Sequence, residues 1–208
     1  MKSSKVLEML QQNRIDELMA ELQDEIFTES LKTKPNVKKR YTAMKRYLKS
    51  CSETRPILQK PCEVEFEGSQ YNAFCNTYTL AMTKESCGEI AMCDEPDRFP
   101  KVTNLVKRDG DEGRIDLNKV MAEAKSKGYK FTKNQIYNND FLMHYNESYF
   151  RIGLVDITYG VIDNGEEAVV YGGSRNRPIT VENDIGIAVI MPVRLDGGPE
   201  ENMVIIEA

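Results

Sequence analysis

The sequence lacks the features that mark metal-binding, membrane and secreted proteins. Its five cysteines are an odd number without C-x-x-C spacing, and it has a single histidine, His144. A structural metal cage needs more ligands than these, so we expect neither a metal ion nor another cofactor. No apolar run reaches membrane-spanning length, and the first ten residues lack the apolar core and small-residue cleavage site of a signal peptide. The sequence therefore favours a reduced, cytoplasmic protein.

Patterns typical of an active site are also missing. No Ser/His/Asp or Cys/His arrangement suggests an activated nucleophile, and no glycine-rich loop follows a strand to hold a phosphate. His144 lies in the strand-like run FLMHY, which indicates a hydrogen-bonded structural histidine. An enzyme would have to assemble its site from scattered acids such as Asp116, Asp140 and Asp156. The sequence favours a non-catalytic protein over that alternative.

The 208 residues, of which 40% are hydrophobic, allow one substantial domain with an appendage or two small domains. Local patterns divide the chain into a helical segment at 1–51, a mixed α+β domain at 62–195 and a tail at 196–208. A proline-punctuated connection at 52–61 joins the first two parts. We therefore predict an α+β protein with a helical N-terminal segment.

The first 31 residues have the periodicity of a helix whose other face is acidic. Asn13 is a candidate N-cap for its longer part. The predicted buried stripe comprises Ile15, Leu18 or Met19, Leu22 and Ile26. The methionines of the helical segment, Met9, Met19 and Met44, are expected to fill the core.

A second helix is predicted at 36–50, after a break at Lys32 to Pro35. Its apolar stripe comprises Val37, Tyr41, Met44, Leu48 and Cys51. The rest of its surface carries Lys38, Lys39, Arg40, Lys45, Arg46 and Lys49. Between Lys32 and Lys60 there are ten basic residues and one acid, a charge of +9 in a chain whose net charge is -5. Such a helix either meets a polyanion or is a solvated face, and the sequence leaves both open.

The β-rich part opens with a predicted strand at 63–67, a hairpin turn at Gly68-Ser69 and a strand region at 71–82. Further on, Asp116 is the predicted N-cap of a helix at 117–127. Strands are expected after that helix, at 129–132 and at 141–145. The stretch from Arg114 to Tyr145 thus has the order strand, helix, strand.

The stretch from Ser148 to Val193 repeats that order in full. A short β entry at 149–153 leads into a helix at 154–162, which ends at Asn164-Gly165. Three strands follow, at 168–171, 177–182 and 185–193. The last has no polar face, which predicts a strand covered on both sides or one that closes a subunit contact. Because a repeated unit should use its elements alike, we predict that the two helices are neighbours on one face of an antiparallel sheet.

This second unit resembles the C-terminal half-domain of bacterial sliding clamps, the processivity subunit of the replicative polymerase. The resemblance rests on the entry FRIG at 150–153, the strand RPITVE at 177–182 and the ending VIMPVRL at 189–195. Two earlier runs are similar in the same order. FCNTYTLA at 74–81 is similar to the clamp run TDGHRLA, and Phe99-Pro100 with Leu105 is similar to FPDY..L. The resemblance implies clamp-like β-α-β-β-β repeats and no catalysis.

The resemblance also implies two kinds of site. A partner-peptide pocket would comprise Thr77, Tyr78, Leu80, Val189, Ile190, Met191 and Val193, whose apolar members are equally compatible with the core. DNA would be met by Lys119, Lys125 and Lys127 on the first helix, and the helix at 154–162 has no basic residue. Together with the six basic residues of the second N-terminal helix, these are the candidate DNA contacts.

The chain departs from clamps in ways that bear on function. It is far too short for a three-domain clamp, and Cys75-Asn76-Thr77-Tyr78-Thr79 stands where clamps have Thr-Asp-Gly-His-Arg. The resemblance implies a sliding-clamp-like protein of DNA replication that binds duplex DNA, replication proteins or both, as a homo-oligomer if it closes a ring. The alternative is an adaptor or regulatory module on a clamp-like scaffold that does not encircle DNA. No membrane partner is expected.

The tail continues beyond the point where the clamp ending stops. Asp196-Gly197-Gly198-Pro199 breaks the last strand, but Met203 to Ile206 is too apolar to remain in water. We predict that the tail docks on its own domain or on a neighbouring chain, with the Met191 surface as one candidate position.

Overall fold

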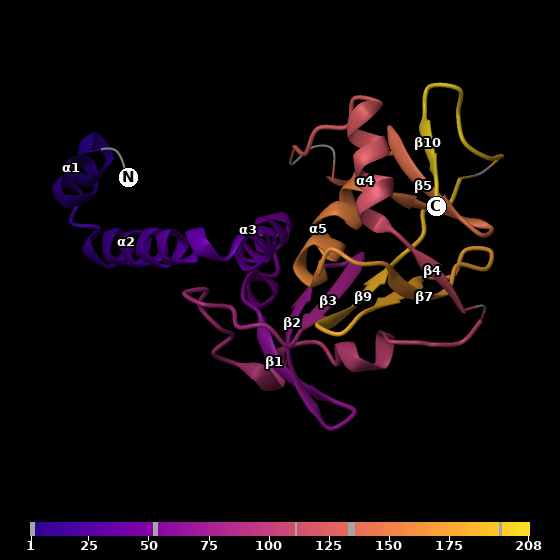
Figure 1. The fold of residues 1–208 in the computed structure, drawn as a ribbon. Coiled ribbons are helices and arrows are strands. Elements are labelled where there is room, and N and C mark those ends of the chain that lie inside the picture. The colour runs from indigo at the N-terminus through magenta and orange to yellow at the C-terminus, as the bar shows by residue number, and fades with distance from the viewer. Residues whose placement is uncertain (1–2, 52–53, 111, 133–135, 196) are drawn as a thin grey trace.

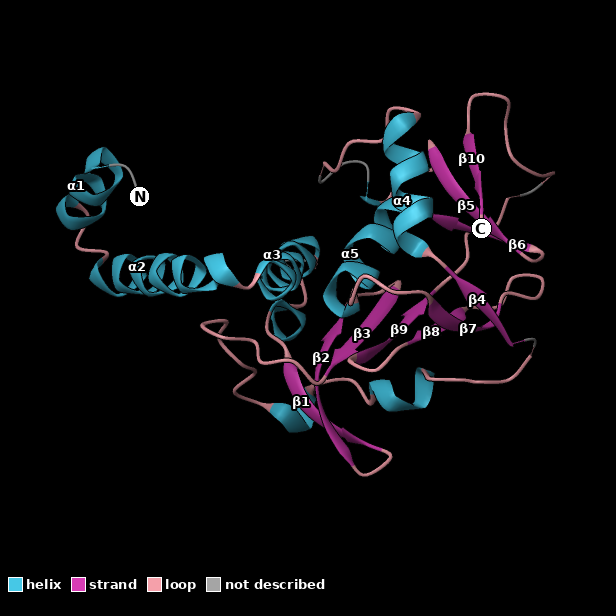
Figure 2. Ribbon diagram, viewed as in Figure 1, coloured by secondary structure: helices cyan, strands magenta, loops and turns pink. Residues whose placement is uncertain are grey.

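A seven-stranded antiparallel sheet is the largest element of the computed structural model (Figures 1 and 2). The structure describes residues 3–51, 54–110, 112–132, 136–195 and 197–208. The helices are α1 (Ser3–Gln11), α2 (Ile15–Ser30), α3 (Pro35–Ser50), α4 (Leu117–Ser126) and α5 (Ile152–Ile162). The strands are β1 (Cys62–Phe66), β2 (Ser69–Cys75), β3 (Thr79–Thr83), β4 (Glu112–Ile115), β5 (Phe141–Tyr145), β6 (Ser148–Arg151), β7 (Ala168–Gly172), β8 (Ile179–Glu182), β9 (Gly186–Ile190) and β10 (Val204–Glu207). Short 3-10 helices lie at Leu31–Thr33, Pro56–Gln59, Pro96–Arg98 and Val102–Leu105.

The strand order shows that the two ends of the domain meet in one sheet. The large sheet runs β1-β2-β3-β9-β8-β7-β4, and the small one runs β10-β5-β6. Every pairing in the large sheet is antiparallel, as predicted, and its centre is the β3–β9 pair, in which Ala81 lies opposite Ala188. All five residues of each of these two strands are buried. The apolar character of β9 on both faces is therefore explained by cover on both sides.

The helices α4 and α5 are neighbours, as the repeat predicted. Asp116 caps α4 by accepting a hydrogen bond from the backbone N–H of Lys119 at 3.1 Å. The helix α5 contacts α4, and it also packs on β3 and β9 of the large sheet and on β5 and β6 of the small one. Asn118 of α4 donates to Asp163, which follows α5, at 3.2 Å. The two copies of the repeat thus share one helical layer.

The helix α3 belongs to the same hydrophobic core. Pro35 occupies its first turn, where the missing N–H is tolerated. Met44 and Tyr47 are buried against the domain, and the Tyr47 hydroxyl donates to the backbone oxygen of Thr79 at 2.8 Å. A Cβ on Gly160 of α5 would lie 3.0 Å from the Cβ of Ala43, so the two helices approach closely because residue 160 has no side chain. The predicted boundary near residue 51 falls at the end of α3, within this shared core.

The N-terminal helices differ from the prediction in two respects. Asn13 does not cap α2: it adopts a left-handed conformation with φ of 55°, and Arg14 takes the N-cap position without a side-chain hydrogen bond. The predicted buried stripe is largely exposed, because only Leu18 of α2 is buried. Met9 and Met44 fill the core as expected, but Met19 is 51% exposed. Figure 1 shows α1 and α2 projecting from the domain, which leaves this stripe without a covering layer.

One predicted strand does not form, and another ends earlier than predicted. Residues 129–132 form no strand, although Tyr129 is buried against the core. The last strand ends at Ile190, so Met191 and Val193 lie beyond it, and Val193 forms an isolated bridge with Tyr149. The β1–β2 hairpin was predicted correctly, but its turn lies one residue earlier than predicted, at Glu67 and Gly68, which have positive φ values of 51° and 73°.

The tail docks on its own domain. Within it, β10 pairs in parallel with β5, and Ile206 is fully buried. The tail therefore completes the small sheet and does not cover the Met191 surface. Ser52 and Glu53 of the predicted connection and Asp196 of the tail lie outside the described residues. None of the helices in the described ranges is both long and apolar enough to cross a membrane.

Candidate functional site

Exposed aromatic and methionine side chains gather where β3 begins and β9 ends. Tyr78 is 42% exposed and Met191 is 37% exposed, and the Met191 backbone N–H donates to the Tyr78 carbonyl at 3.1 Å. The ring of Tyr137 lies 5.5 Å from that of Tyr78, and the Arg151 guanidinium lies 5.8 Å from the Tyr78 ring centroid. We name Tyr78, Tyr137 and Met191, with exposed Thr77, the tyrosine–methionine surface.

The turn that presents Tyr78 is held by a buried asparagine. The side-chain oxygen of Asn76 accepts hydrogen bonds from the backbone N–H groups of Tyr78 and Thr79, both at 2.8 Å. Tyr137 is fixed separately, because its hydroxyl donates to the Ser50 carbonyl at 2.6 Å. Both aromatic rings are therefore positioned before any partner arrives, which lowers the entropy cost of binding.

The seven predicted pocket residues fall into two groups. Thr77, Tyr78 and Met191 are exposed and reach a partner directly. The other four, Leu80, Val189, Ile190 and Val193, are buried. These four side chains pack beneath the tyrosine–methionine surface, and their apolar character is that of core residues. Tyr137 and Arg151 join the surface only through tertiary contacts, so no sequence motif marked them.

The basic residues of α3 are largely neutralised by acids of the same chain. Arg40, only 7% exposed, pairs with Glu85 at 3.0 Å and donates to the Asp163 carbonyl at 3.1 Å. Arg46 pairs with Asp156 of α5 at 2.7 Å and also lies over a ring, 3.7 Å from the Phe131 centroid.

Two lysines of α3 also have acidic partners. Lys39 forms an ion pair with Asp163, and Lys45 forms one with Asp24 of α2. Neither Lys38 nor Lys49 has an ion pair within the described parts of the chain. Most of the basic side chains of α3 therefore form ion pairs that hold this helix against the rest of the chain.

Asp163 is the centre of this docking. It is 4% exposed, and burial alone would raise the pKa of its carboxyl group. Hydrogen bonds from Lys39, from Asn118 and from the backbone N–H of Gly165 outweigh that effect, so the pKa lies below its ordinary value. Asp163 thus remains ionised at neutral pH and holds α3, α4 and the end of α5 together.

Two of the three lysines of α4 are paired with acids, which makes them less available to contact DNA. Lys119 pairs with Asp116 at 3.3 Å, and Lys127 pairs with Glu123 at 2.7 Å and donates to the Ile205 carbonyl at 3.2 Å. Lys125 has no ion pair among the described residues. The helix layer therefore offers few unpaired positive charges.

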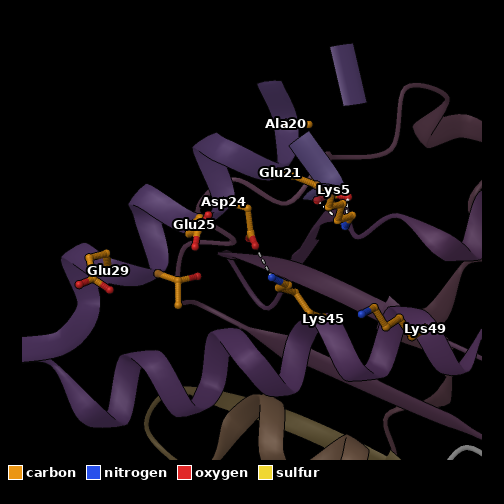
Figure 3. Close-up of a pocket in the computed structure, with 9 residues that line it drawn as sticks. Lys5, Ala20, Glu21, Asp24, Glu25, Glu29, Lys45 and Lys49 are labelled. Carbon is orange, nitrogen blue, oxygen red and sulfur yellow. Dashed lines mark hydrogen bonds and ion pairs between the residues drawn. The ribbon is translucent and has the colours of Figure 1, made fainter. Parts of the chain in front are cut away.

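An open groove of about 770 Å³ runs between α2 and α3 (Figure 3). Acids of α2 line one side, and Lys45 and Lys49 line the other. The ion pair of Asp24 with Lys45 crosses it, and Glu21, which also lines the groove, pairs with Lys5 of α1. The groove is a polar seam between the helices rather than an apolar ligand pocket.

The groups considered for catalysis are committed to structural interactions. Asp116 caps α4, Asp140 accepts from the Asn138 side chain at 2.7 Å, and Asp156 binds Arg46. His144 is hydrogen-bonded to Glu207 through Nδ1 at 2.8 Å and stacks on Tyr149, so the predicted structural role is confirmed. Each of these four side chains is thus held by a contact within the fold.

Solved structures of sliding clamps are similar to this chain. The C. crescentus beta sliding clamp matches with a TM-score of 0.51 and 13% identity, over 77% of this chain and 64% of the clamp chain. The chain has a sliding-clamp-like fold. A protein described as a DNA polymerase III beta subunit from Eubacterium rectale matches with a TM-score of 0.47 and 10% identity, over 76% and 64% of the two chains. No protein-family model and no curated sequence matches the chain.

The predicted clamp-like α+β class with a large antiparallel sheet is thereby confirmed. At 13% identity the likeness concerns the fold alone, and the chain spans 64% of the length of the clamp that it matches. The clamp-like scaffold also carries a helix, α3, which packs on α5 and pairs with Asp156 and Asp163.

Proposed function

We propose that this chain is a non-catalytic, sliding-clamp-like binding module of DNA replication, which holds a replication protein at the tyrosine–methionine surface and does not encircle DNA. The observation that carries the proposal is that Tyr78 and Met191, which the clamp resemblance assigned to a partner-peptide pocket, lie together and exposed. Aromatic and methionine side chains are enriched at protein interfaces, which supports a peptide partner. The expected location is the cytoplasm.

The position of α3 supports the non-encircling form. The resemblance to clamps implies that helices in the place of α4 and α5 line a DNA channel. A helix packed on α5, as α3 is, would occupy that space, and Arg40 and Arg46 are used to hold it there. Size-exclusion chromatography with light scattering should therefore find no closed oligomer at micromolar concentration.

Site-specific photocrosslinking tests the partner surface. With p-benzoylphenylalanine in place of Tyr78, the full chain in its host cell should crosslink to a protein of the replication machinery, identified by mass spectrometry. The same group at exposed Glu65 of β1 is the matched control and should not capture that protein. Adding Met191→Ala should reduce the crosslink about tenfold, the loss expected when one central contact is removed. Equal capture from positions 78 and 65, or capture only of proteins outside replication, would contradict the proposal.

Sequence-independent DNA binding is the second candidate, and the unpaired Lys38, Lys49 and Lys125 favour it. We expect weak duplex binding that falls steeply with salt. Losing two phosphate contacts in Lys38→Glu/Lys49→Glu should make the slope of log K against log salt shallower by about 1.8. The control Lys101→Glu/Lys107→Glu changes the net charge equally at exposed positions elsewhere and should bind as the unmodified chain does. Equal binding by both double variants would exclude α3, and no binding at low salt would leave the protein-binding function alone.

A further inference from the structure

The helix α2 contacts the helix α3 through its polar side. Asp24 accepts a hydrogen bond from the Tyr41 hydroxyl at 2.6 Å and pairs with Lys45. Phe27 packs edge-on against Tyr41, with ring centroids 4.9 Å apart. Asp24 consequently points across the groove of Figure 3 toward Lys45 of α3, and Glu21 pairs with Lys5 of α1. The apolar side of α2 is left to face away from the domain.

The outward side of α2 carries a row of exposed aliphatic side chains. Ile15, Met19 and Ile26 are 52%, 51% and 70% exposed, and Leu22 between them is half-buried. Their spacing of four, seven and eleven residues from Ile15 places them on one helical face, and Asp24 lies roughly 180° away at 100° per residue. We name Ile15, Met19 and Ile26 the apolar stripe.

The apolar stripe is a patch and not a set of scattered residues. The neighbouring helix α1 also exposes Leu7 and Leu10, by 60% and 49%. Single exposed aliphatic residues need no explanation, but a continuous row on a projecting helix pair marks an interaction site. A helix with such a row binds a partner helix through contacts at i, i+4 and i+7.

The negative charge around the apolar stripe indicates which kind of partner would bind there. The sixteen residues of α2 include six acids and no lysine or arginine. Over residues 3–30, α1, α2 and their connection carry seven acids and two basic residues, a net charge of -5. Asp16 borders the stripe on one edge and Glu25 and Glu29 border the other, where Glu29 also pairs with Lys32. A second copy of this helix would place acids against acids, whereas a helix with lysine or arginine beside its apolar face would complement both features.

We propose that the apolar stripe of α2 is the docking site of a basic amphipathic helix from another protein, separate from the tyrosine–methionine surface. The aliphatic row would bury the apolar face of that helix, and the flanking acids would meet its basic edges. The site stands whether or not the replication partner proposed above is correct, because the two surfaces share no residue.

Fluorescence anisotropy with designed peptides tests this site. The probe is an 18-residue helical peptide with leucines at i, i+3, i+4 and i+7 and lysines elsewhere, and its matched control has glutamates in place of the lysines. The lysine peptide should bind the full chain at least about tenfold more tightly than the control, and more weakly as salt rises. Met19→Gln/Ile26→Gln should weaken that binding about tenfold, since both side chains are exposed and their loss leaves the core intact. Tyr78→Ala/Met191→Ala should leave it unchanged.

Three outcomes would overturn the proposal. Equal binding of the two peptides would show that charge does not select the partner. No binding of the lysine peptide, or the same affinity for the Met19→Gln/Ile26→Gln variant, would show that the apolar stripe is not the site. A dimer of the unmodified chain that this double variant dissociates would show that a second copy is the occupant. Failure of the Tyr78 crosslink alone would bear only on the replication partner.

Discussion

Replacing Tyr47 with alanine is expected to lower the free energy of unfolding by about 3–5 kcal/mol, as for other buried aromatic side chains. Tyr47 is fully buried, its ring lies edge-on to that of Phe74, and its hydroxyl donates to the Thr79 carbonyl. It therefore joins α3 to the strands β2 and β3 beside the tyrosine–methionine surface. Urea unfolding of the full chain, followed by circular dichroism, measures the change.

The matched control is Tyr47→Phe, which keeps the ring and removes only the hydroxyl. Its expected cost is about 1 kcal/mol, because the Thr79 carbonyl also accepts from the Asn76 backbone N–H at 3.0 Å and stays satisfied. A cost under about 1 kcal/mol for Tyr47→Ala would mean that α3 is only loosely attached to the domain. The proposed blockage of a DNA channel by α3 would then lose its support.

Deleting residues 202–208 is expected to cost roughly 2–4 kcal/mol, through the loss of one fully buried isoleucine and a parallel strand pairing. The deletion removes β10, including Ile206, and the hydrogen bond of Glu207 with His144. For a chain of this size, the change corresponds to a fall in melting temperature of roughly 4–16 °C. Differential scanning calorimetry measures it directly.

Two variants separate the strand from the rest of the tail. Ile206→Ala alone should reproduce most of the loss, at about 2–4 kcal/mol. Glu200→Ala/Glu201→Ala changes exposed residues of the preceding turn and should leave the melting temperature unchanged. An unchanged melting temperature after the full deletion would show that β10 does not stabilise the small sheet.

The sequence predicted those elements whose signals are local. Asp116, followed by an apolar periodicity, identified α4, because a capping side chain acts on the backbone three residues away. Asn164-Gly165 placed the end of α5 correctly, since Gly165 has a φ of 88°. The central strand β9 was recognised from its unbroken apolar run, which only a doubly covered strand tolerates.

The errors occurred where tertiary contacts override local preference. Asn13 is a good capping residue by type, but a left-handed turn between α1 and α2 uses it instead. Residues 129–132 have β-forming side chains, yet the Tyr129 hydroxyl donates to Asp156 at 3.1 Å and its ring packs edge-on against Phe141 of β5. Local preferences for helix caps and for strands could therefore not predict the conformation of Asn13 or of residues 129–132.

The candidate sites show the same limit. The charge on α3 indicated a polyanion or a solvated face, but the acids that neutralise Arg40 and Arg46 lie 45 and 110 residues further along the chain. Tyr78 and Met191 could be proposed from their motifs. Tyr137 could not, because its contribution depends on a hydrogen bond to Ser50 and on a ring contact that no spacing encodes.

The pairing of β3 with β9 also shapes how the protein is made. Thr83 lies opposite Gly186, so about 100 residues must leave the ribosome after β3 before its partner exists. At ordinary rates of synthesis this takes roughly 5–20 s. During that time β3, whose five side chains are all buried in the finished protein, presents an open apolar edge. Nascent chains of this protein are therefore natural clients for a chaperone that shields exposed strands until β9 is complete.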